Sequence, residues 1–381
     1  MTRTMGLVYK PDQNIEATCC GRTLMLTGDP MASVQGGVWV INPLQDDRWS
    51  GFVDRHPNSS LFHTIGWLKA LRTTYGYEPI AFTTSAPSEE LTNALLVCVV
   101  QSWLTRGRLV SLPFSDHCEP LVENSEQLRT LCTHLEALRR TQRWKYAEMR
   151  TSDTFHGAEE GFRECKVYRW HRLDLRSSLD ALYKGFHKSC IRRRIRHAEH
   201  QGLRYEEGRD ESLVRSFYDL MVLSRLRKHL PPQPFEWFQS LVSCMGKDVC
   251  IRLAFKGDHP IAGILTMSHG KKMYYKYGGS DARFNNLGAT PTLLWKAIQA
   301  AKSAGMEELD LGRSEMENRG LIQFKERWGA QSVRLTLWRG PIGEVSLSLE
   351  RLKLRLAKSV CASVPQKILV MAGRLMYRHI G

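Results

Sequence analysis

One order of strand, turn, helix and strand is predicted twice in this chain, and the two copies are about 165 residues apart. In the earlier copy, a strand run ends near Asp116, Ser125 caps a helix, and a short strand covers 144–150. The corresponding positions of the later copy are Asp281, Thr290 and 309–315. Side-chain identity between the copies is low, so the spacing of the elements carries the prediction that the chain contains one α/β unit twice.

The later copy shows the local signals most clearly. Its β-rich runs 261–269 and 272–280 are separated by only two residues, which predicts a hairpin with a tight turn. Thr290 is a suitable helix N-cap with proline directly after it, and Gly305 is a suitable helix end. A short strand, 308–314, follows this helix. These signals predict an α/β site region near the C-terminal end of that strand.

The chain is long enough for two domains and appendages. We expect an α/β (α+β) fold with a mixed sheet and flanking helices in each domain, divided as 38–170 and 171–340. Within the second domain, 179–246 is predicted to be mostly helical. The leader 1–37 lacks sustained periodicity and is expected to be mobile. Residues 341–381 are predicted to form a basic, amphipathic helical tail.

Composition favours an acidic partner. The net charge is +15, from 54 Lys and Arg against 39 Asp and Glu, which suits a phosphorylated substrate, RNA or anionic lipid, or serves solubility alone. The ten cysteines show no CxxC and no Cys/His ligand spacing, so we expect reduced thiols, no metal site and a cytoplasmic protein. The longest apolar run, 94–100, has the length of a strand, so no transmembrane span is predicted.

Two segments concentrate positive charge on predicted amphipathic helices. The first, 188–196, includes Arg192 and Arg193, and such a run is usually a solvated helix face. The second, 345–380, carries two apolar stripes interleaved with Lys and Arg. This tail either makes peripheral contact with the anionic inner face of a membrane or packs on the domain.

The segment 272–330, KMYYKYGGSDARFNNLGATPTLLWKAIQAAKSAGMEELDLGRSEMENRGLIQFKERWGA, resembles the C-terminal half of Fem-type (FemA/FemB/FemX-like) aminoacyltransferases and of related tandem GNAT acyltransferases. The earlier runs FHTIGWLKAL (62–71) and PFSDHCEPL (113–121) resemble the N-terminal half of the same group. The resemblance covers about 38–340. Within it the basic run 188–196 resembles the Arg-rich helix that precedes the second domain of relatives, which implies that this run binds phosphate groups of a substrate or RNA. The resemblance as a whole implies two tandem GNAT-like domains that transfer an acyl or aminoacyl group to an amine.

This resemblance implies catalytic roles for four residues. Lys325, in the matched pair Phe324-Lys325, stabilises the oxyanion or a substrate phosphate. Asp310 and Arg313 orient polar groups in the cleft, and Tyr277 on the preceding strand contacts substrate. Each residue has an alternative: Lys325 as a surface lysine, Asp310 with Arg313 as an ion pair, and the two aromatic residues as core.

The run Ser115, Asp116, His117 and Cys118 suggests a catalytic triad, which we reject. Neighbours on a strand point to opposite faces, and triads are assembled from separate segments. The resemblance instead implies that Ser115, Asp116 and His117 contact the acceptor, and a structural turn is the alternative.

The expected donor site is the loop before the later helix. A typical GNAT cofactor loop is Gly-rich and basic, whereas ARFNNLGATP offers Arg283, Gly288, Ala289 and Thr290 at a helix N-terminus. We expect no tightly bound cofactor. The donor is an aminoacyl-tRNA or an acyl-CoA, and the residues leave this choice open.

We therefore expect an acyl- or aminoacyltransferase acting on an amine of a phosphorylated or glycoconjugate acceptor, such as a peptidoglycan precursor of the cell envelope. The alternative is a non-catalytic module of the same fold that binds RNA or anionic lipid through its basic surface. The joint presence of Lys325, Asp310 and Arg313 favours the enzyme.

Overall fold

The computed structural model describes residues 37–101, 107–152, 161–340 and 366–380, together with the backbone of three short strands before residue 37. Two of these strands, β1 (Glu16–Cys19) and β2 (Arg22–Met25), pair with each other. The rest of the predicted leader and the first part of the predicted tail, 341–365, lie outside the described residues.

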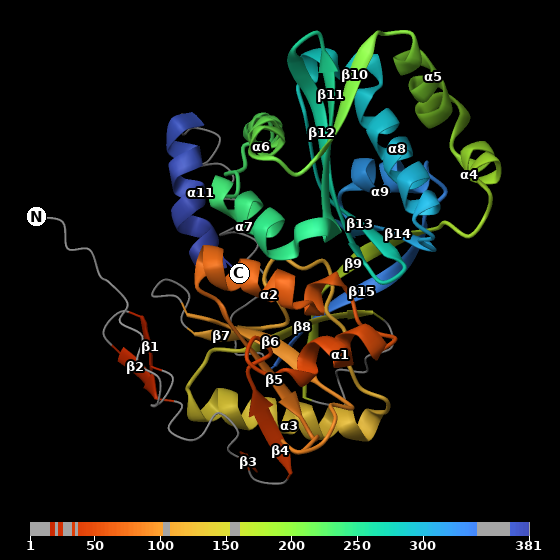
Figure 1. The fold of residues 1–381 in the computed structure, drawn as a ribbon. Helices are drawn as coiled ribbons and strands as arrows, with labels where there is room; N and C mark the ends of the chain where they lie inside the picture. Colours follow the sequence, from red (N-terminus) through yellow and green to blue (C-terminus); the bar gives the residue numbers. More distant parts are fainter. Residues whose placement is uncertain are drawn as a thin grey trace, which may run out of the picture.

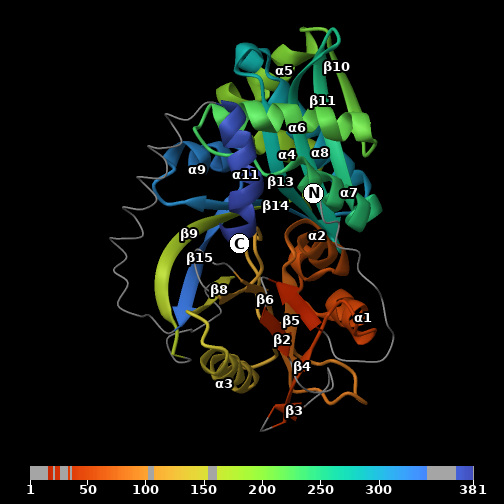
Figure 2. The same ribbon diagram turned by 90° about the vertical axis from the view of Figure 1, so that its left-hand side faces the viewer.

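A single mixed sheet of 13 strands runs through the described part of the chain (Figures 1 and 2). Its strands, in chain order, are β3 (Ser33–Val34), β4 (Val38–Ile41), β5 (Glu78–Thr83), β6 (Leu95–Val100), β7 (Arg108–Val110), β8 (Ala147–Ser152), β9 (Arg163–Asp174), β10 (Leu203–Gly208), β11 (Val249–Lys256), β12 (His259–His269), β13 (Lys272–Ser280), β14 (Glu308–Glu315) and β15 (Gln331–Gly340). In space they follow the order β10-β11-β12-β13-β14-β9-β15-β8-β7-β6-β5-β4-β3.

The sheet consists of two similar halves. In each half an antiparallel meander ends in a strand that pairs in parallel with the next one, β7 with β8 and β13 with β14. The crossover helix between these parallel strands is α3 (Ser125–Thr141) in the first half and α8 (Ala289–Ser303) in the second. The predicted fold class, a repeated α/β unit with a mixed sheet and flanking helices, is confirmed.

The last strand of each half pairs with the other half. β9 follows β8 in the sequence but lies between β14 and β15, and β15 follows β14 but pairs with β8 and β9. Figure 2 shows β9 and β15 side by side where the halves meet. Residue 170, where we placed the boundary between the predicted domains, lies inside β9.

Helices cover both faces of the sheet. They are α1 (Arg48–Arg55), α2 (Ile65–Tyr75), α3, α4 (Leu179–Gly185), α5 (Arg193–Glu199), α6 (Glu211–Leu226), α7 (Phe235–Met245), α8, α9 (Arg319–Glu326) and α11 (Gln366–Ile380), with short 3₁₀ or π turns at Leu61–His63, Lys188–Arg192, Gly246–Asp248 and Ala282–Leu287. On one face α1, α2, α6 and α7 share one apolar core that extends across both halves. On the other face, α3 and α8 cover separate cores.

Aromatic contacts join the two halves within the shared core. Trp67 of α2 meets Trp237 of α7 edge to face, with ring centroids 5.4 Å apart, and both side chains are fully buried. Phe62 makes a similar contact with Tyr274 of β13 at 5.8 Å. The halves therefore share a hydrophobic interior and do not move as separate bodies on a flexible linker.

The C-terminal helix α11 packs across both halves. Tyr377 is buried, its carbonyl oxygen accepts a hydrogen bond from Tyr77 of the first half, and its hydroxyl contacts Arg225 and the carbonyl of Pro231 in the second. Leu369 is buried on the same helix, while Met371 is 68% exposed. Of the two predicted apolar stripes, the described one therefore packs on the domain through part of its length. No described helix is long and apolar enough to cross a membrane.

Two predicted helix caps are wrong by one or two positions. α3 is capped by Asn124, whose side chain accepts a backbone N–H of the first turn, so Ser125 is already helical. α8 starts after Gly288, whose φ of +77° is the left-handed conformation that glycine tolerates. Thr290 and Pro291 consequently lie inside the first turn.

The prediction that 179–246 is mostly helical is wrong for β10. This strand is at the edge of the sheet, pairs only with β11, and exposes alternate charged residues such as Arg204 and Glu206. With one face in water and no apolar run, it lacks the hydrophobic signal that marks the central strands.

Candidate active site

β13 and β14 separate after a short parallel pairing, and the gap between the two strands is filled by side chains. They pair only from Lys272 opposite Glu308 to Tyr274 opposite Asp310. Beyond that point, β14 contains a β-bulge against β9 between Asp310 and Arg313, with Gly312 at φ +71°. Backbone groups that no longer pair with a neighbouring strand must find other partners there.

The first half supplies one of these partners. Nζ of Lys276 on β13 forms an ion pair with Asp116 and donates to its carboxylate at 2.6 Å, and this carboxylate lies 3.5 Å from the backbone nitrogen of Arg313 on β14. A Cβ atom at Gly312 would be 3.2 Å from this carboxylate, so the side chain touches the bulge directly. Asp116 therefore bridges the two separated strands from the opposite half.

The loop that carries Asp116 has an unusual backbone. Leu112 and Phe114 have positive φ angles of 48° and 60°, which side-chain-bearing residues rarely adopt. Arg150 of β8 holds the loop by donating from Nη1 to the Leu112 carbonyl at 2.9 Å, and the hydroxyl of Ser115 donates to the same carbonyl at 2.8 Å. Such strain is maintained only where surrounding contacts enforce it.

Asp310 is the centre of a second polar cluster. Its carboxylate accepts hydrogen bonds from the indole N–H of Trp170 at 2.9 Å and from the backbone N–H of Gly312 at 2.6 Å. Nε2 of His117, from the first half, lies 3.1 Å from the other carboxylate oxygen. Both Asp310 and His117 are buried, and the His117 ring packs on the Trp170 indole at 4.1 Å between centroids.

The alternative of an Asp310–Arg313 ion pair is not what the geometry shows. Among the described residues no ion pair joins the two, and the Arg313 guanidinium lies over the Tyr168 ring at 4.7 Å. Nη1 of Arg313 is buried and has no hydrogen-bond partner. A buried, unpaired guanidinium N–H is unusual and is available to an added anionic or carbonyl group.

Lys325 is not a surface lysine. It is the only buried side chain of α9, at 3% exposure, and its ammonium donates to the carbonyls of Gly312 at 2.8 Å and Arg313 at 3.0 Å. Burial lowers the pKa of Lys325 to about 8, while the nearby carboxylates of Asp116 and Asp310 act in the opposite direction. Lys325 thus fixes the bulge through the two backbone carbonyls of Gly312 and Arg313.

Two other predicted substrate residues lie in packed surroundings. Tyr277 is joined to the shared core: its hydroxyl accepts a hydrogen bond from the Trp237 indole at 2.9 Å, and its ring meets Phe238 at 5.3 Å. Burial raises the pKa of Tyr277, so this phenol stays neutral. Ser115 is also buried, and its hydroxyl is used within its own loop.

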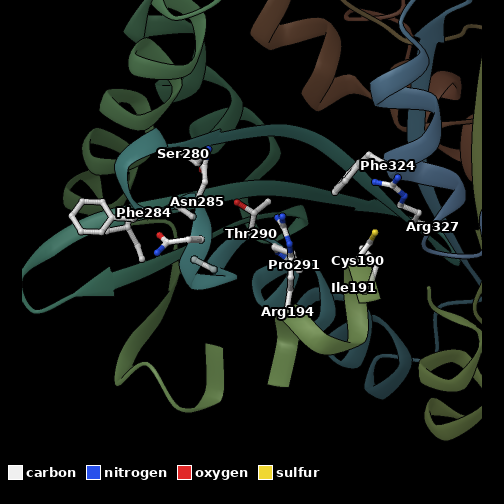
Figure 3. A pocket seen from close by; sticks show the side chains of 14 residues that line it. Cys190, Ile191, Arg194, Ser280, Phe284, Asn285, Thr290, Pro291, Phe324 and Arg327 are labelled. Carbon is white, nitrogen blue, oxygen red and sulfur yellow. The ribbon is translucent and has the colours of Figure 1, made fainter. Parts of the chain in front are cut away.

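A pocket of about 520 Å³ opens at the N-terminus of α8, next to this cluster (Figure 3). Its wall combines the first turn of α8, residues of the basic segment 188–196, and the end of α9. The lining residues include Ala289, Thr290, Cys190, Arg194, Phe324 and Arg327. In Figure 3 the Arg194 side chain extends toward Thr290, and Phe324 and Arg327 lie at the other end. The N-terminus of α8 with the Arg194 guanidinium beside it is a suitable seat for phosphate, and Arg327 adds a second guanidinium at the other end of the pocket.

The other predicted donor residues lie beside this pocket. Gly288 permits the close approach of the basic segment, because a Cβ atom there would be 2.3 Å from the Arg194 carbonyl oxygen. Arg283 does not line the pocket; it is exposed and pairs with Asp281 at 2.6 Å. Arg192 and Arg193 also lie outside the lining, two residues and one residue before Arg194.

α9 connects the pocket to the buried cluster. Phe324 lines the pocket, and the next residue, Lys325, reaches the bulge on the inner side. Arg194 belongs to the basic run 188–196 that the sequence singles out, whereas two contributors, Arg327 and Lys276, were not predicted. A lysine within the β-rich run 272–280 was a visible signal for Lys276, whereas nothing local distinguished Arg327. Within the described residues, no group of three or more His, Cys, Asp or Glu side chains is placed to hold a metal ion.

Comparison with known proteins gives the class. Residues 186–326, which span α5 to α9, match the family model described as an acetyltransferase (GNAT) domain. This stretch contains the bulge, Lys325 and every residue that lines the pocket except Arg327. The predicted enzyme class, an acyltransferase, is confirmed at the level of this domain family. No curated protein sequence matches the chain at a significant level.

Solved structures narrow the fold further. FemX superimposes with a TM-score of 0.63 at 15% identity, covering 81% of this chain and 98% of FemX. A tandem GNAT protein from the clavulanic acid biosynthesis pathway gives 0.52 at 10% identity, covering 80% and 100%. The C-terminal domain of a protein from Agrobacterium fabrum described as a lysylphosphatidylglycerol synthetase gives 0.51 at 14%, covering 82% and 96%. At these identities the shared property is the fold, and the predicted resemblance to Fem-type and tandem GNAT proteins is confirmed.

Proposed function

We propose that this chain transfers an acyl or aminoacyl group to an amine of a phosphorylated or glycoconjugate acceptor of the cell envelope. The observation that carries the proposal is the adjacency of Phe324 and Lys325. The first lines a pocket suited to phosphate, and the second places a buried ammonium at the gap between β13 and β14. The donor occupies the pocket, and its carbonyl extends past Phe324 toward Lys325.

The movement of charge and protons in the reaction gives a role to each group. The neutral amine attacks the donor carbonyl carbon, a C–N bond forms, and the bond to the ester oxygen of a tRNA donor or the sulfur of a thioester donor breaks. The ammonium of Lys325 stabilises the negative charge that develops on the carbonyl oxygen. The amine proton neutralises the departing oxygen or sulfur. The loop with Ser115, Asp116 and His117 forms the acceptor side of the cleft.

Two of the similar structures suggest the acceptor class. FemX shares the fold over most of this chain, and the name lysylphosphatidylglycerol synthetase denotes a product that joins lysine to a phospholipid. An amine carried by a phosphorylated envelope component would also suit the positive charge of this chain. A peptidoglycan precursor is the first acceptor that we would test.

The deciding experiment is intact-mass screening of candidate amine acceptors with two separate sets of donors. One set contains acyl-CoA thioesters and the other contains charged tRNAs. We expect a product in one of the sets, and this product should form roughly a hundredfold more slowly with Lys325→Ala. A product that persists at the wild-type rate with Lys325→Ala contradicts the catalytic role, and the absence of product with both sets contradicts the transferase proposal.

The basic segment favours a second candidate, a module that binds RNA or anionic lipid. Among the described residues, no acidic side chain pairs with Arg192, Arg193, Arg194 or Arg196. The last three of these side chains are exposed. A non-catalytic module should bind a short RNA duplex or anionic vesicles but give no product in the screen.

We expect the double variant Arg192→Ala/Arg193→Ala to weaken binding of tRNA and of acyl-CoA, because both carry phosphates. The loss should shrink as salt increases, since about one counterion is released for each phosphate contact. Fluorescence anisotropy at several salt concentrations measures this. The matched control is Arg55→Ala/Arg215→Ala, which removes two exposed arginines elsewhere. A loss that does not depend on salt would indicate misfolding and contradict a phosphate-binding role.

A further inference from the structure

We propose that Asp116 of the first half is a positioning residue for Lys325 of the second half, and that it acts through the Gly312-Arg313 bulge of β14. The two side chains hold the same short piece of backbone from two sides. This inference rests on the proposed catalytic role of Lys325, but the contacts that it predicts can be tested without any substrate.

The bulge has no strand to pair with on the side of β13, so side chains satisfy its polar atoms. The N–H of Gly312 is taken by Asp310 at 2.6 Å, and the N–H of Arg313 faces Asp116 at 3.5 Å. Both carbonyls accept from Lys325. If the bulge shifts, the two acceptors that fix the Lys325 ammonium shift with it. The position of the ammonium therefore depends on what holds the bulge.

Asp116 itself is held by the buried ammonium of Lys276. Lys276 Nζ donates to Asp116 at 2.6 Å and to the Phe114 carbonyl at 2.8 Å. The same ammonium lies over the rings of Phe62 at 5.1 Å and Trp67 at 5.5 Å, both from the first half. Lys276 belongs to β13 of the second half, but most of the groups that its ammonium contacts belong to the first half. This arrangement fixes Asp116 relative to the second half with little freedom.

The charges around the bulge explain why a carboxylate is needed. Burial opposes the charge of Asp116, but the ammonium of Lys276 and the guanidinium of Arg313 outweigh burial and hold its pKa well below the usual range. Without Asp116, the positive charges of Lys276, Arg313 and Lys325 would be left facing one another, with Asp310 as the nearest carboxylate. Mutual repulsion would then push the bulge and Lys325 apart.

The loop geometry supports the same conclusion. Two side-chain-bearing residues, Leu112 and Phe114, take positive φ angles just before Asp116, and Arg150 of β8 holds this shape. A relaxed loop would be more stable locally but would not project the carboxylate into the gap between β13 and β14. The strained backbone at Leu112 and Phe114 therefore places the carboxylate of Asp116 between β13 and β14.

Hydrogen exchange of the full chain, read by mass spectrometry, tests the proposal. In Asp116→Ala, we expect amides of 309–326 to exchange roughly tenfold faster, because the bulge and α9 lose an anchor. The conservative variant Asp116→Glu should restore part of the protection. The matched control is Asp46→Asn, which breaks the 2.7 Å ion pair with Arg48 inside the first half and should leave 309–326 unchanged.

A second variant separates positioning from simple neutralisation. The double variant Asp116→Ala/Lys276→Met removes both partners of the buried ion pair and leaves no unpaired Lys276, so it should fold even if Asp116→Ala does not. If Asp116 positions the bulge, the amides of 309–326 should still exchange fast in the double variant, because the contact between Asp116 and the bulge is still missing. Restored protection there, or faster exchange confined to 111–118 in Asp116→Ala, would overturn the proposal.

Turnover gives an independent readout when a substrate pair is known. The isosteric change Asp116→Asn removes a charge that raises the pKa of Lys325, so the alkaline limb of kcat should move to lower pH. Asp46→Asn should keep the wild-type profile. An unchanged limb in Asp116→Asn, with only KM altered, would assign Asp116 to acceptor binding and overturn positioning. If the screen yields no product at all, the function fails while the exchange result still stands.

Discussion

Lys325 is an exception to the normal behaviour of lysine, and the reason lies in its two acceptors. A lysine on a short amphipathic helix usually extends into water, and burying an ammonium without partners is strongly unfavourable. Here the carbonyls of Gly312 and Arg313 supply those partners. They are free to do so because a bulge has removed them from the sheet. The buried lysine and the bulge therefore explain each other.

This environment predicts a pH dependence of turnover. Because burial lowers the pKa of Lys325 to about 8, the fraction of ammonium falls as pH rises through that value, and activity that needs the charge falls with it. We expect Lys325→Ala to reduce kcat by roughly a hundredfold. Initial rates between pH 6 and 10 measure both effects. A rate that is flat from pH 7 to 10 would contradict the role of the charged form.

At the residue scale, the sequence identified part of the cluster. The pair Phe324-Lys325 could be located through its resemblance to a known motif, and Asp116 and His117 through their place after a strand run. Trp170 could not, because its indole meets Asp310 only after β9 has crossed into the other half. A side chain whose role depends on a pairing 140 residues away leaves no local signal.

At the element scale, the bulge of β14 is the feature on which the site depends. Gly312 combines a positive φ with direct contact to the Asp116 carboxylate, whereas Gly305, after α8, has nearly the same φ of +72° and open space around it. The two glycines share their conformational demand and differ only in their surroundings. That difference makes them a matched pair for mutation.

We expect Gly312→Ala to destabilise the protein more than Gly305→Ala. Both changes introduce left-handed strain of about 1 kcal/mol. Only the first also forces the carboxylate of Asp116 away, which should bring its total to roughly 2–3 kcal/mol. Urea denaturation followed by circular dichroism measures the free energy of unfolding. Equal losses in the two variants would show that the carboxylate is not in tight contact with the bulge.

The helix α11 provides a second comparison between elements. Tyr377 is buried between the halves, packs on Phe114 at 5.7 Å and contacts Tyr77 and Arg225, while Met371 on the same helix is 68% exposed. Tyr377→Ala should lower the free energy of unfolding by roughly 3 kcal/mol. Met371→Ala should change it by less than about 0.5 kcal/mol. A small effect of Tyr377→Ala would mean that α11 is detached in solution.

Elements were predictable where their signals were local. The hairpin of β12 and β13 and the helix α8 follow from turn residues and apolar periodicity within about twenty positions. β10 was missed because an edge strand needs no continuous apolar run. β9 and β15 were missed for another reason: each is defined by a partner in the opposite half, and register between distant segments is not visible in either segment alone.

At the scale of the whole molecule, the halves share one sheet and one core, so the protonation of groups buried in either half affects the stability of the entire chain. His63 and His171 are fully buried. Burial lowers the pKa of His63 to about 3 and that of His171 to about 4, where the positive charge of Lys325 also contributes. Both imidazoles are neutral in the folded protein near pH 7.

We expect the free energy of unfolding to fall as pH decreases from 6.5 toward 4. The folded pKa values lie below the ordinary value of histidine, so the unfolded state binds more protons in this window and is favoured there. Each histidine contributes up to roughly 1.4 kcal/mol per pH unit. Denaturation at pH 7 and pH 5 measures the effect. His63→Gln should reduce the slope, and His200→Gln, which changes an exposed histidine, should not.

Because β9 and β15 each pair with strands of the other half, the order of synthesis on the ribosome matters for folding. When residue 152 has emerged, the first half has every strand except the one that will cover β8, and that strand begins at residue 331. β9 in turn has no neighbour until β14 and β15 have been made. The nascent first half must therefore wait, with an open sheet edge, for nearly the whole chain. Such an intermediate is a natural client for a chaperone, and slow translation would prolong its exposure to aggregation.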